Sequence, residues 1–85
     1  MQKGFNSDLN LGNSSVHIQT EDWGNQNPFI VTRVFKNGAV IQTLKTPYEI
    51  VLPFGPISDD QAIRLAMKEQ HHKILDGLLS GEISI

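Results

Sequence analysis

The stretch SVHIQTEDWGNQNPFIV holds the side chains of this sequence that are best suited to chemistry. His17, Glu21 and Asp22 are of the types that move protons or bind metal ions, and the chain's only tryptophan, Trp23, follows them directly. The apolar alternation before Glu21 predicts a strand, which would place His17 and Glu21 about 13 Å apart. One ion cannot contact both side chains across that distance. We therefore expect no metal or other cofactor here, and we expect Asp22 to accept backbone hydrogen bonds at a turn.

The other histidines are equally unsuited to a metal site. His71 and His72 are adjacent in a predicted helix, where neighbouring side chains point about 100° apart, whereas helical zinc ligands are spaced four residues apart. We expect His71 to lie beside the buried face of that helix and His72 on its outer side. Because the chain also has no nucleophile motif and no glycine-rich phosphate loop, we expect a protein that is not an enzyme.

Two residues near this stretch have alternative interpretations that the sequence leaves open. Arg33 either forms an ion pair with Glu21 or Asp22 on a neighbouring strand, or presents its guanidinium to an acidic partner. Trp23 either anchors a loop on the core or contacts a partner. The competing functional hypothesis is a ligand-binding or metal-assisted enzyme domain that uses His17, Glu21, Asp22 and Arg33.

Length, charge and cysteine content narrow the class of protein. A chain of 85 residues forms a single domain, 1–85, which buries roughly 60% of its unfolded surface, so association with a partner would add stability. The absence of cysteine fits a reducing compartment, and no apolar segment suggests a signal peptide or a membrane span. The formal charge of −2 offers no attraction for phosphates. We therefore expect a soluble cytoplasmic protein that binds neither nucleic acid nor membranes.

The elements that must position these residues follow from apolar periodicity and turn residues. Period-two alternation predicts strands at about 4–11, 15–21, 29–36 and 39–46, joined as two hairpins. Asn37 and Gly38 suit a two-residue type I′ turn, which would place Phe35 opposite Val40 and Val34 opposite Ile41. The same register would pair Arg33 with Gln42, Thr32 with Thr43, Val31 with Leu44 and Ile30 with Lys45.

A long helix is predicted at about 59–79. Ser58 is its expected N-cap, Gln61 is the capping-box partner, and Gly81 is the stop signal. The preceding segment, 47–57, contains three prolines and should cross over to the helix, with a short strand from Tyr48 to Leu52. The predicted fold is therefore an α+β domain, in which a four-stranded antiparallel sheet carries one C-terminal helix on one face. The stripe of the helix that should lie on the sheet comprises Ile63, Ala66, Met67, Gln70, Ile74 and Leu78.

More apolar surface is present than one sheet and one helix are expected to cover. A second stripe of the helix comprises Leu65, Lys68, His72, Leu75 and Leu79. Either Leu75 and Leu79 pack on the crossover and Leu65 is exposed, or the stripe forms a partner surface. The second face of the sheet, with Ile30, Val34 and Ile41, is expected to be partly apolar as well. We therefore predict a non-enzymatic interaction or adaptor module, with a homodimer as one form of it. The expected partner-binding residues are Trp23, Ile30, Val34, Ile41, Leu65, His72, Leu75 and Leu79.

The run VHIQTEDWG, followed by PFIVTRVFKNGAVI and TPY, resembles a small domain of uncharacterised bacterial proteins. In that domain an H-x-Q-T-E-D stretch precedes a hairpin and a T-x-Y segment. The resemblance spans Val16 to Tyr48, about 40% of the chain. It implies a bacterial protein in which HIQTED is a recurring structural or binding element, and it implies no particular activity.

Overall fold

The computed structural model describes residues 4–24, 26–51 and 60–85. They form an α+β fold with an antiparallel four-stranded sheet and one long C-terminal helix, as the sequence predicted. Each strand and the long helix begin and end within one residue of the expected ranges. The elements are β1 (Phe5–Leu11), β2 (Ser14–Asp22), β3 (Phe29–Lys36), β4 (Ala39–Pro47), α1 (Tyr48–Val51) and α2 (Asp60–Ser80).

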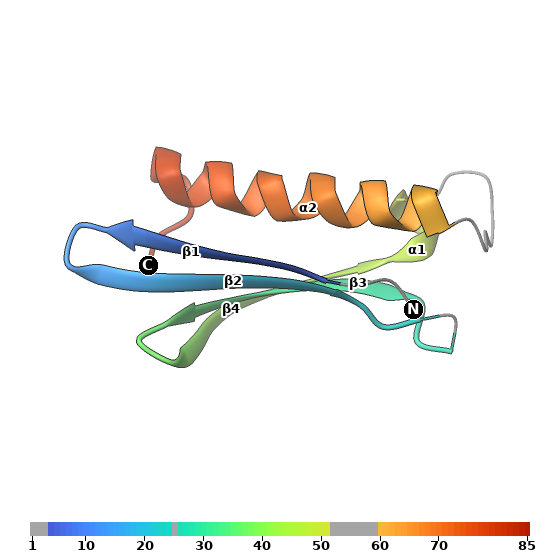
Figure 1. The fold of residues 1–85 in the computed structure, drawn as a ribbon, viewed down its shortest axis with the longest axis horizontal. Coiled ribbons are helices and arrows are strands. Elements are labelled where there is room, and N and C mark those ends of the chain that lie inside the picture. Colours follow the sequence, from blue (N-terminus) through green and yellow to red (C-terminus); the bar gives the residue numbers. More distant parts are fainter. Residues whose placement is uncertain (1–3, 25, 52–59) are drawn as a thin grey trace.

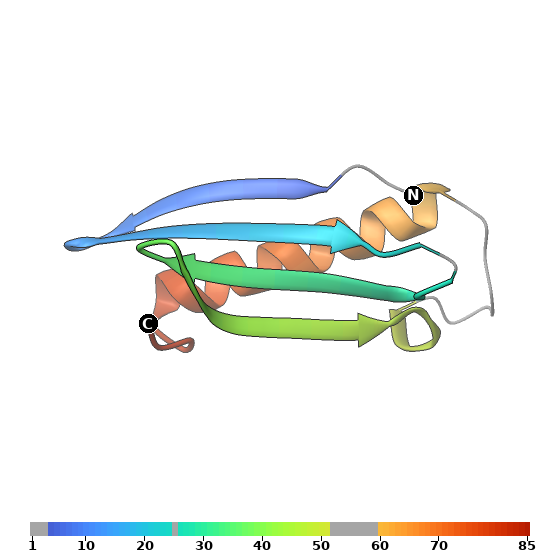
Figure 2. The same ribbon diagram turned by 90° about the horizontal axis from the view of Figure 1, so that it is seen from below.

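The two layers of the fold leave one face of the sheet uncovered. The strands lie side by side in the order β1-β2-β3-β4, so β2 and β3 are central. Helix α2 runs along one face of the sheet (Figure 1). Seen from the side of the sheet that faces away from α2, the strands lie in front and α2 lies behind them (Figure 2). We call the side under α2 the helix face and the opposite side, over which no other described element lies, the outer face.

The alternation along β2 divides its side chains between these two faces. Thr20 lies opposite Phe5 on β1 and Thr32 on β3, and it contacts α2 through a hydrogen bond to His71. The even-numbered residues of β2 from position 16 onwards are all buried, whereas the odd-numbered residues between them are partly exposed. Every second residue therefore belongs to the core, as the period of a half-covered strand requires.

The hairpin between β3 and β4 has the predicted turn but a different register. Asn37 and Gly38 have φ angles of 52° and 85°, as a type I′ turn requires, and Phe35 lies opposite Val40. A β-bulge then follows, so that Val34 pairs with Gln42 rather than with Ile41. The predicted pairs beyond Val40 are therefore wrong by one residue. The shift is explained by burial, because it brings Leu44 opposite Thr32 on the helix face, where Leu44 packs on the core.

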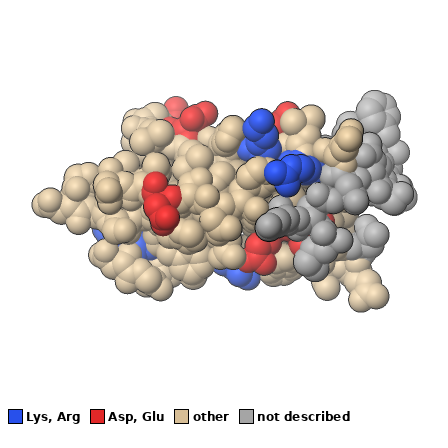
Figure 3. Space-filling view, viewed as in Figure 1, with Lys and Arg blue, Asp and Glu red and all other residues tan. Residues whose placement is uncertain are grey.

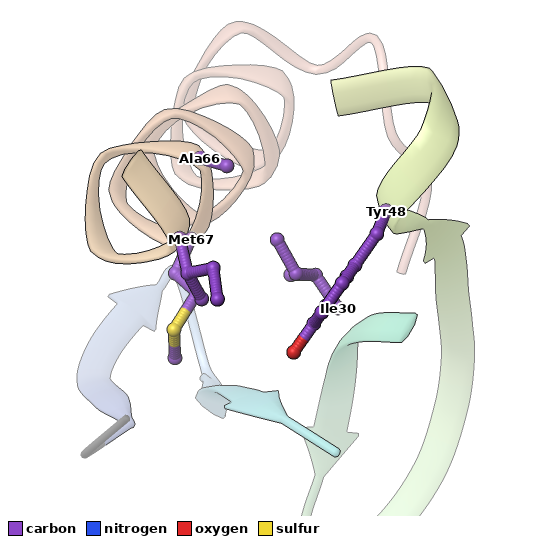
Figure 4. Close-up of a cluster of buried hydrophobic side chains, with 5 residues drawn as sticks. Ile30, Tyr48, Ala66 and Met67 are labelled. Carbon is purple, nitrogen blue, oxygen red and sulfur yellow. The ribbon is translucent and has the colours of Figure 1, made fainter. Parts of the chain in front are cut away.

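The core consists of two apolar clusters between α2 and the sheet. The first contains Ile30, Tyr48, Ile63, Ala66 and Met67. Figure 4 shows Ile30 of β3 with Ala66 and Met67 of α2 on one side and Tyr48, at the start of α1, on the other. The second contains Val16, Ile18, Val34, Ile74 and Leu78.

Ile30 and Val34 do not lie on a surface that a partner can reach, and that prediction is wrong. Their exposed fractions are 0% and 1%. Both belong to the central strand β3, and their positions in the register place them on the helix face, under α2. The alternation along β3 is as predicted, but Ile30 and Val34 lie on the face that α2 covers and not on the uncovered face.

The segment after β4 forms a helical turn, α1, and not the predicted strand from Tyr48 to Leu52. The backbone N–H of Tyr48 donates to the carbonyl of Pro28 at 2.9 Å, and the Tyr48 ring is buried in the first cluster. The chain therefore turns over the helix face at Tyr48 instead of extending the sheet. The rest of the predicted crossover, and the predicted N-cap Ser58, lie outside the described residues.

The final residues fold back onto the helix without forming a strand. Gly81 takes a positive φ of 83°, and the N–H of Ile83 donates to the carbonyl of Gly77 at 3.0 Å. The Ile83 side chain packs on the second cluster. A Cβ atom on Gly77 would lie 2.5 Å from Cδ1 of Ile83, so the glycine makes room for this contact.

Met67→Ala should lower the free energy of unfolding by about 2–5 kcal/mol, because Met67 is fully buried between α2 and the sheet. The matched control is Leu65→Ala on the exposed side of the same helix, which should change it by less than about 0.5 kcal/mol. Urea denaturation of both variants measures the difference. Equal losses would contradict this assignment of the two sides of α2.

Candidate functional site

The residues of HIQTED divide between the two faces of the sheet. Thr20 and Asp22 are buried on the helix face with Ile18, while His17, Gln19 and Glu21 are partly exposed on the outer face. The inward and outward residues of the stretch therefore have separate roles. The buried residues determine how rigidly the outward residues are held.

Asp22 holds together three segments at one end of the sheet. Its buried carboxylate accepts hydrogen bonds from the N–H of Gly24, at 2.9 Å, and from the hydroxyl of Tyr48. The expectation that Asp22 accepts a backbone hydrogen bond at a turn is confirmed. Burial raises the pKa of Tyr48 well above its usual value, and the hydrogen bond and negative charge of Asp22 raise that pKa further. Tyr48 therefore stays protonated and donates to Asp22, which ties the end of β2 to the start of α1.

Next to this contact, a chain of hydrogen bonds runs between α2 and the strands. His71 Nδ1 lies 2.7 Å from the Thr20 hydroxyl, and His71 Nε2 lies 2.8 Å from the Ser7 hydroxyl. The Thr20 and Thr32 hydroxyl oxygens are 2.7 Å apart. The side-chain amide of Gln70 donates to Thr32 at 3.0 Å. The chain thus links α2 to β1, β2 and β3 through side chains that are largely buried.

The donors and acceptors in this chain determine the tautomer of His71. The amide nitrogen of Gln70 can only donate, so Thr32 accepts from it. Every buried hydroxyl hydrogen then has an acceptor only if Thr32 donates to Thr20 and Thr20 donates to Nδ1 of His71. His71 therefore carries its proton on Nε2 and donates to Ser7. Burial, with smaller contributions from the charges of His72 and His17, lowers the pKa of His71, so the ring is held in its neutral form.

At one end of the outer face, two cationic side chains lie against two aromatic rings. Lys45 Nζ is 5.1 Å from the centre of the Trp23 ring and 4.2 Å from that of Phe29. Arg33 Cζ is 5.6 Å from the Trp23 ring centre, and its NH1 lies 3.7 Å from Oε1 of Glu21. Of the two interpretations left open for Arg33, the structure therefore shows the internal ion pair, and its partner is Glu21 and not Asp22. We call Trp23, Phe29, Arg33 and Lys45 the Trp23 cluster.

Val31 shows how closely the outer face is packed near this cluster. Val31 lies between Glu21 and Lys45 in the register, on the side away from α2, yet its exposed fraction is only 2%. Side chains of the outer face must therefore cover it. The face behaves as a small second layer of packing and not as a fully hydrated surface.

At the other end of the outer face lies a hollow of about 320 Å³. His17 forms part of its wall, with Nδ1 bonded to Oδ1 of Asp8 at 2.8 Å and its ring centre 5.9 Å from that of Phe35. The hollow lies beside the turn between β3 and β4. The lining residues are Ser15, His17, Gln19, Phe35, Asn37 and Gly38.

The fold does not gather His17, Glu21, Asp22 and Arg33 into one site, as the competing hypothesis requires. Asp22 lies on the helix face and accepts from Tyr48 of α1, His17 forms a hydrogen bond with Asp8, and Glu21 pairs with Arg33. Among the residues that the structure describes, no three His, Asp or Glu side chains lie where they could hold one metal ion. The four residues are split because the stretch runs along a strand with two unlike sides.

The predicted second stripe of α2 is partly exposed. Leu65 and Leu79 are 56% and 63% exposed, and His72 is exposed. Leu75 is partly buried and packs on the second core cluster. Described acidic and basic side chains are interspersed on the side shown in Figure 3, so no charge of one sign accumulates there. Within the described ranges, no helix is long and apolar enough to cross a membrane.

Sequence reasoning missed several residues that the fold brings into these sites. Phe29 and Lys45 flank Trp23 only because β3 and β4 are neighbours, although the odd positions of β3 already predicted one shared face for Val31, Arg33 and Phe35. The hydrogen-bond chain had a weaker signal. Gln70 interrupts an apolar stripe, and Thr20 and Thr32 occupy alternate positions of buried strands.

Lowering the pH from 7 to 5 should weaken the fold through His71. Its pKa in the folded chain is below the unfolded value of about 6.5, so its contribution is complete above pH 6.5 and is lost as the pH falls through the folded pKa. The slope approaches at most about 1.4 kcal/mol per pH unit. Urea denaturation should show a shallower pH dependence in His71→Gln than in the matched variant His72→Gln. Equal slopes in the two variants would refute this role.

Tyr48→Phe keeps the buried ring but removes one donor to the Asp22 carboxylate. The variant should lose about 1–3 kcal/mol of unfolding free energy, the usual effect of removing a partner from a buried acceptor. A double-mutant cycle with Asp22→Asn, measured by urea denaturation, should show that the two losses are not additive. Strict additivity would mean that the two side chains do not interact.

Comparisons with protein-family models, curated proteins and solved structures found no match to this chain.

Proposed function

We propose that this chain is a non-enzymatic interaction module that binds a protein partner through the outer face of its sheet. In this proposal it acts in the bacterial cytoplasm, either as a homodimer or as an adaptor for a larger protein. The observation that carries the proposal is the Trp23 cluster, which packs two aromatic rings and two cations on the face that α2 leaves uncovered.

The composition of this face supports protein binding. A solvated sheet face needs only polar side chains, but here Trp23, Phe29 and Phe35 are aromatic and Arg33 lies among them. Tryptophan and arginine are enriched among the residues that dominate binding energies at protein interfaces. The Trp23 ring is also held by the two cations before any partner arrives, which lowers the entropy lost on binding.

The outer stripe of α2 offers less support as a docking surface. Leu65 and Leu79 are fourteen residues apart, which is about 21 Å along the helix, and isolated exposed leucines are common on protein surfaces. The sheet also has exposed apolar residues, Val40 and Ile41, at the bulge of β4. We therefore place the interaction on the sheet and not on the helix.

We favour binding over catalysis because the polar side chains are engaged in contacts with one another. Asp22 is used within the core, Glu21 pairs with Arg33, and His17 pairs with Asp8 at the opposite end of the face from Trp23. His71 ties α2 to the sheet, and Asp22 ties the end of β2 to α1. Their effect is to present a rigid outer face, which is what a binding module requires.

Site-specific photo-crosslinking in the cells that naturally produce this chain tests the binding face. A photoreactive side chain at Thr43, which is exposed opposite Arg33, should form one defined protein adduct. The matched control places the same group at Lys73, which is exposed on α2, and should form no such adduct. Trp23→Ala should reduce the Thr43 adduct at least tenfold, because the ring supplies much of the contact area. No adduct at Thr43, or an equal adduct at Lys73, would overturn the proposal for this face.

Sedimentation equilibrium over a wide concentration range separates the two forms of this proposal. If the partner is a second copy, Trp23→Ala should weaken the dimer at least tenfold, and Leu79→Ser should leave it unchanged. A monomer at every concentration would assign the face to a different protein. The reverse ranking of the two variants would place self-association on α2 instead.

A further inference from the structure

The hollow at the far end of the outer face has walls of a consistent chemistry. Its described lining residues offer a hydroxyl from Ser15, side-chain amides from Gln19 and Asn37, the imidazole of His17 and the ring of Phe35. Lysine and arginine are absent from this described lining. The described walls therefore combine side chains that can accept or donate hydrogen bonds with one aromatic surface, and they hold no lysine or arginine of their own.

Asp8 orients His17 and adds negative charge to this wall. Because Asp8 Oδ1 lies 2.8 Å from Nδ1 of His17 and a carboxylate only accepts, the neutral ring carries its proton on Nδ1. Its second nitrogen, Nε2, is then an acceptor for a ligand. The Asp8 side chain is 84% exposed, so a ligand that approaches the hollow can reach its carboxylate. The complementary ligand is a cation that donates hydrogen bonds.

The aromatic wall and the volume narrow the type of cation. A guanidinium is flat, stacks on aromatic rings and donates in several directions, whereas an ammonium acts as a point charge. A hollow of about 320 Å³ is at the lower end of the range for small-molecule sites, so it suits one side chain better than a large ligand. The outer face already contains such a contact, since Arg33 lies over Trp23 and beside Glu21.

We propose that this hollow binds the guanidinium of an arginine side chain that belongs to the partner protein. The guanidinium stacks on Phe35 and donates to Nε2 of His17 and to the amide oxygen of Gln19, with the carboxylate of Asp8 nearby. This inference rests on the proposed function, because it names the group that a partner on the outer face inserts. The Trp23 cluster and the hollow then hold one partner at the two ends of the same face.

Titration of the full chain with N-acetyl-arginine amide tests the hollow directly. Backbone amide shifts, followed by ¹⁵N-correlated NMR, should saturate at millimolar concentration and should be confined to the lining residues and β1 near Asp8. N-acetyl-lysine amide, which is charged but not planar, should bind at least threefold more weakly. N-acetyl-citrulline amide, which is planar but uncharged, should give no saturable shifts.

Two variants and one matched control identify the groups that bind. Asp8→Asn and Phe35→Leu should each weaken arginine binding at least threefold, since the first removes the charge and the second removes the ring. Asp76→Asn, on the exposed side of α2, should leave binding unchanged. The inference would be overturned by amide shifts that spread over the whole sheet and helix, or that rise linearly with ligand concentration without saturating. Equal binding of the three amides, or binding that Asp8→Asn leaves unchanged, would also overturn it.

The outcome of this titration is separate from that of the proposed function. If crosslinking at Thr43 succeeds but the arginine amide does not bind, the outer face remains an interaction surface and the hollow is not an arginine site. If the arginine amide binds but no partner crosslinks at Thr43, the hollow is a guanidinium site, but the partner-binding function falls and with it the assignment of that guanidinium to a partner.

Discussion

The position of α2 on the sheet depends on the hydrogen-bond chain from Ser7 through His71, Thr20 and Thr32 to Gln70. This chain lies between the two apolar clusters along the helix, which supply most of the buried apolar surface. Apolar contacts alone tolerate small shifts of a helix, but a buried hydroxyl or imidazole without its partner costs about 1–3 kcal/mol. Helix α2 therefore has one favoured position, in which each buried polar side chain of this hydrogen-bond chain has a partner.

The outer face follows from that constraint. Because α2 occupies the helix face and takes up Ile30 and Val34, the apolar residues of the other face have no described element to cover them. Trp23 and the stems of Arg33 and Lys45 provide partial cover near Val31, as long amphipathic side chains often do. A surface that is aromatic, partly ordered and still exposed is suited to binding, which is why we place the proposed partner there.

The HIQTED stretch combines a structural role and a surface role in consecutive residues. Thr20 and Asp22 anchor α2 and α1, whereas the alternate residues His17, Gln19 and Glu21 face outward. A substitution at Thr20 would therefore disturb the packing of the core, while one at Gln19 would change the outer surface. This arrangement also explains why nearby acidic and imidazole groups do not form a reaction centre, since a strand sends adjacent side chains in opposite directions.

The sequence alone determined the α+β class, the four strands, the long helix and the Asn37-Gly38 turn, because these depend on local periodicity and on backbone preferences. It also offered an ion pair of Arg33 with Glu21 or Asp22 as one of two interpretations, and the structure shows the pair with Glu21. Tertiary structure decided which face of β3 meets α2, the bulge that turns Leu44 inward, and the turn of α1 at Tyr48. Period two divides a strand into two sides but does not say which side is covered. That choice is made by the packing of the whole helix and by the buried partners that His71, Gln70 and Asp22 find only in the folded chain.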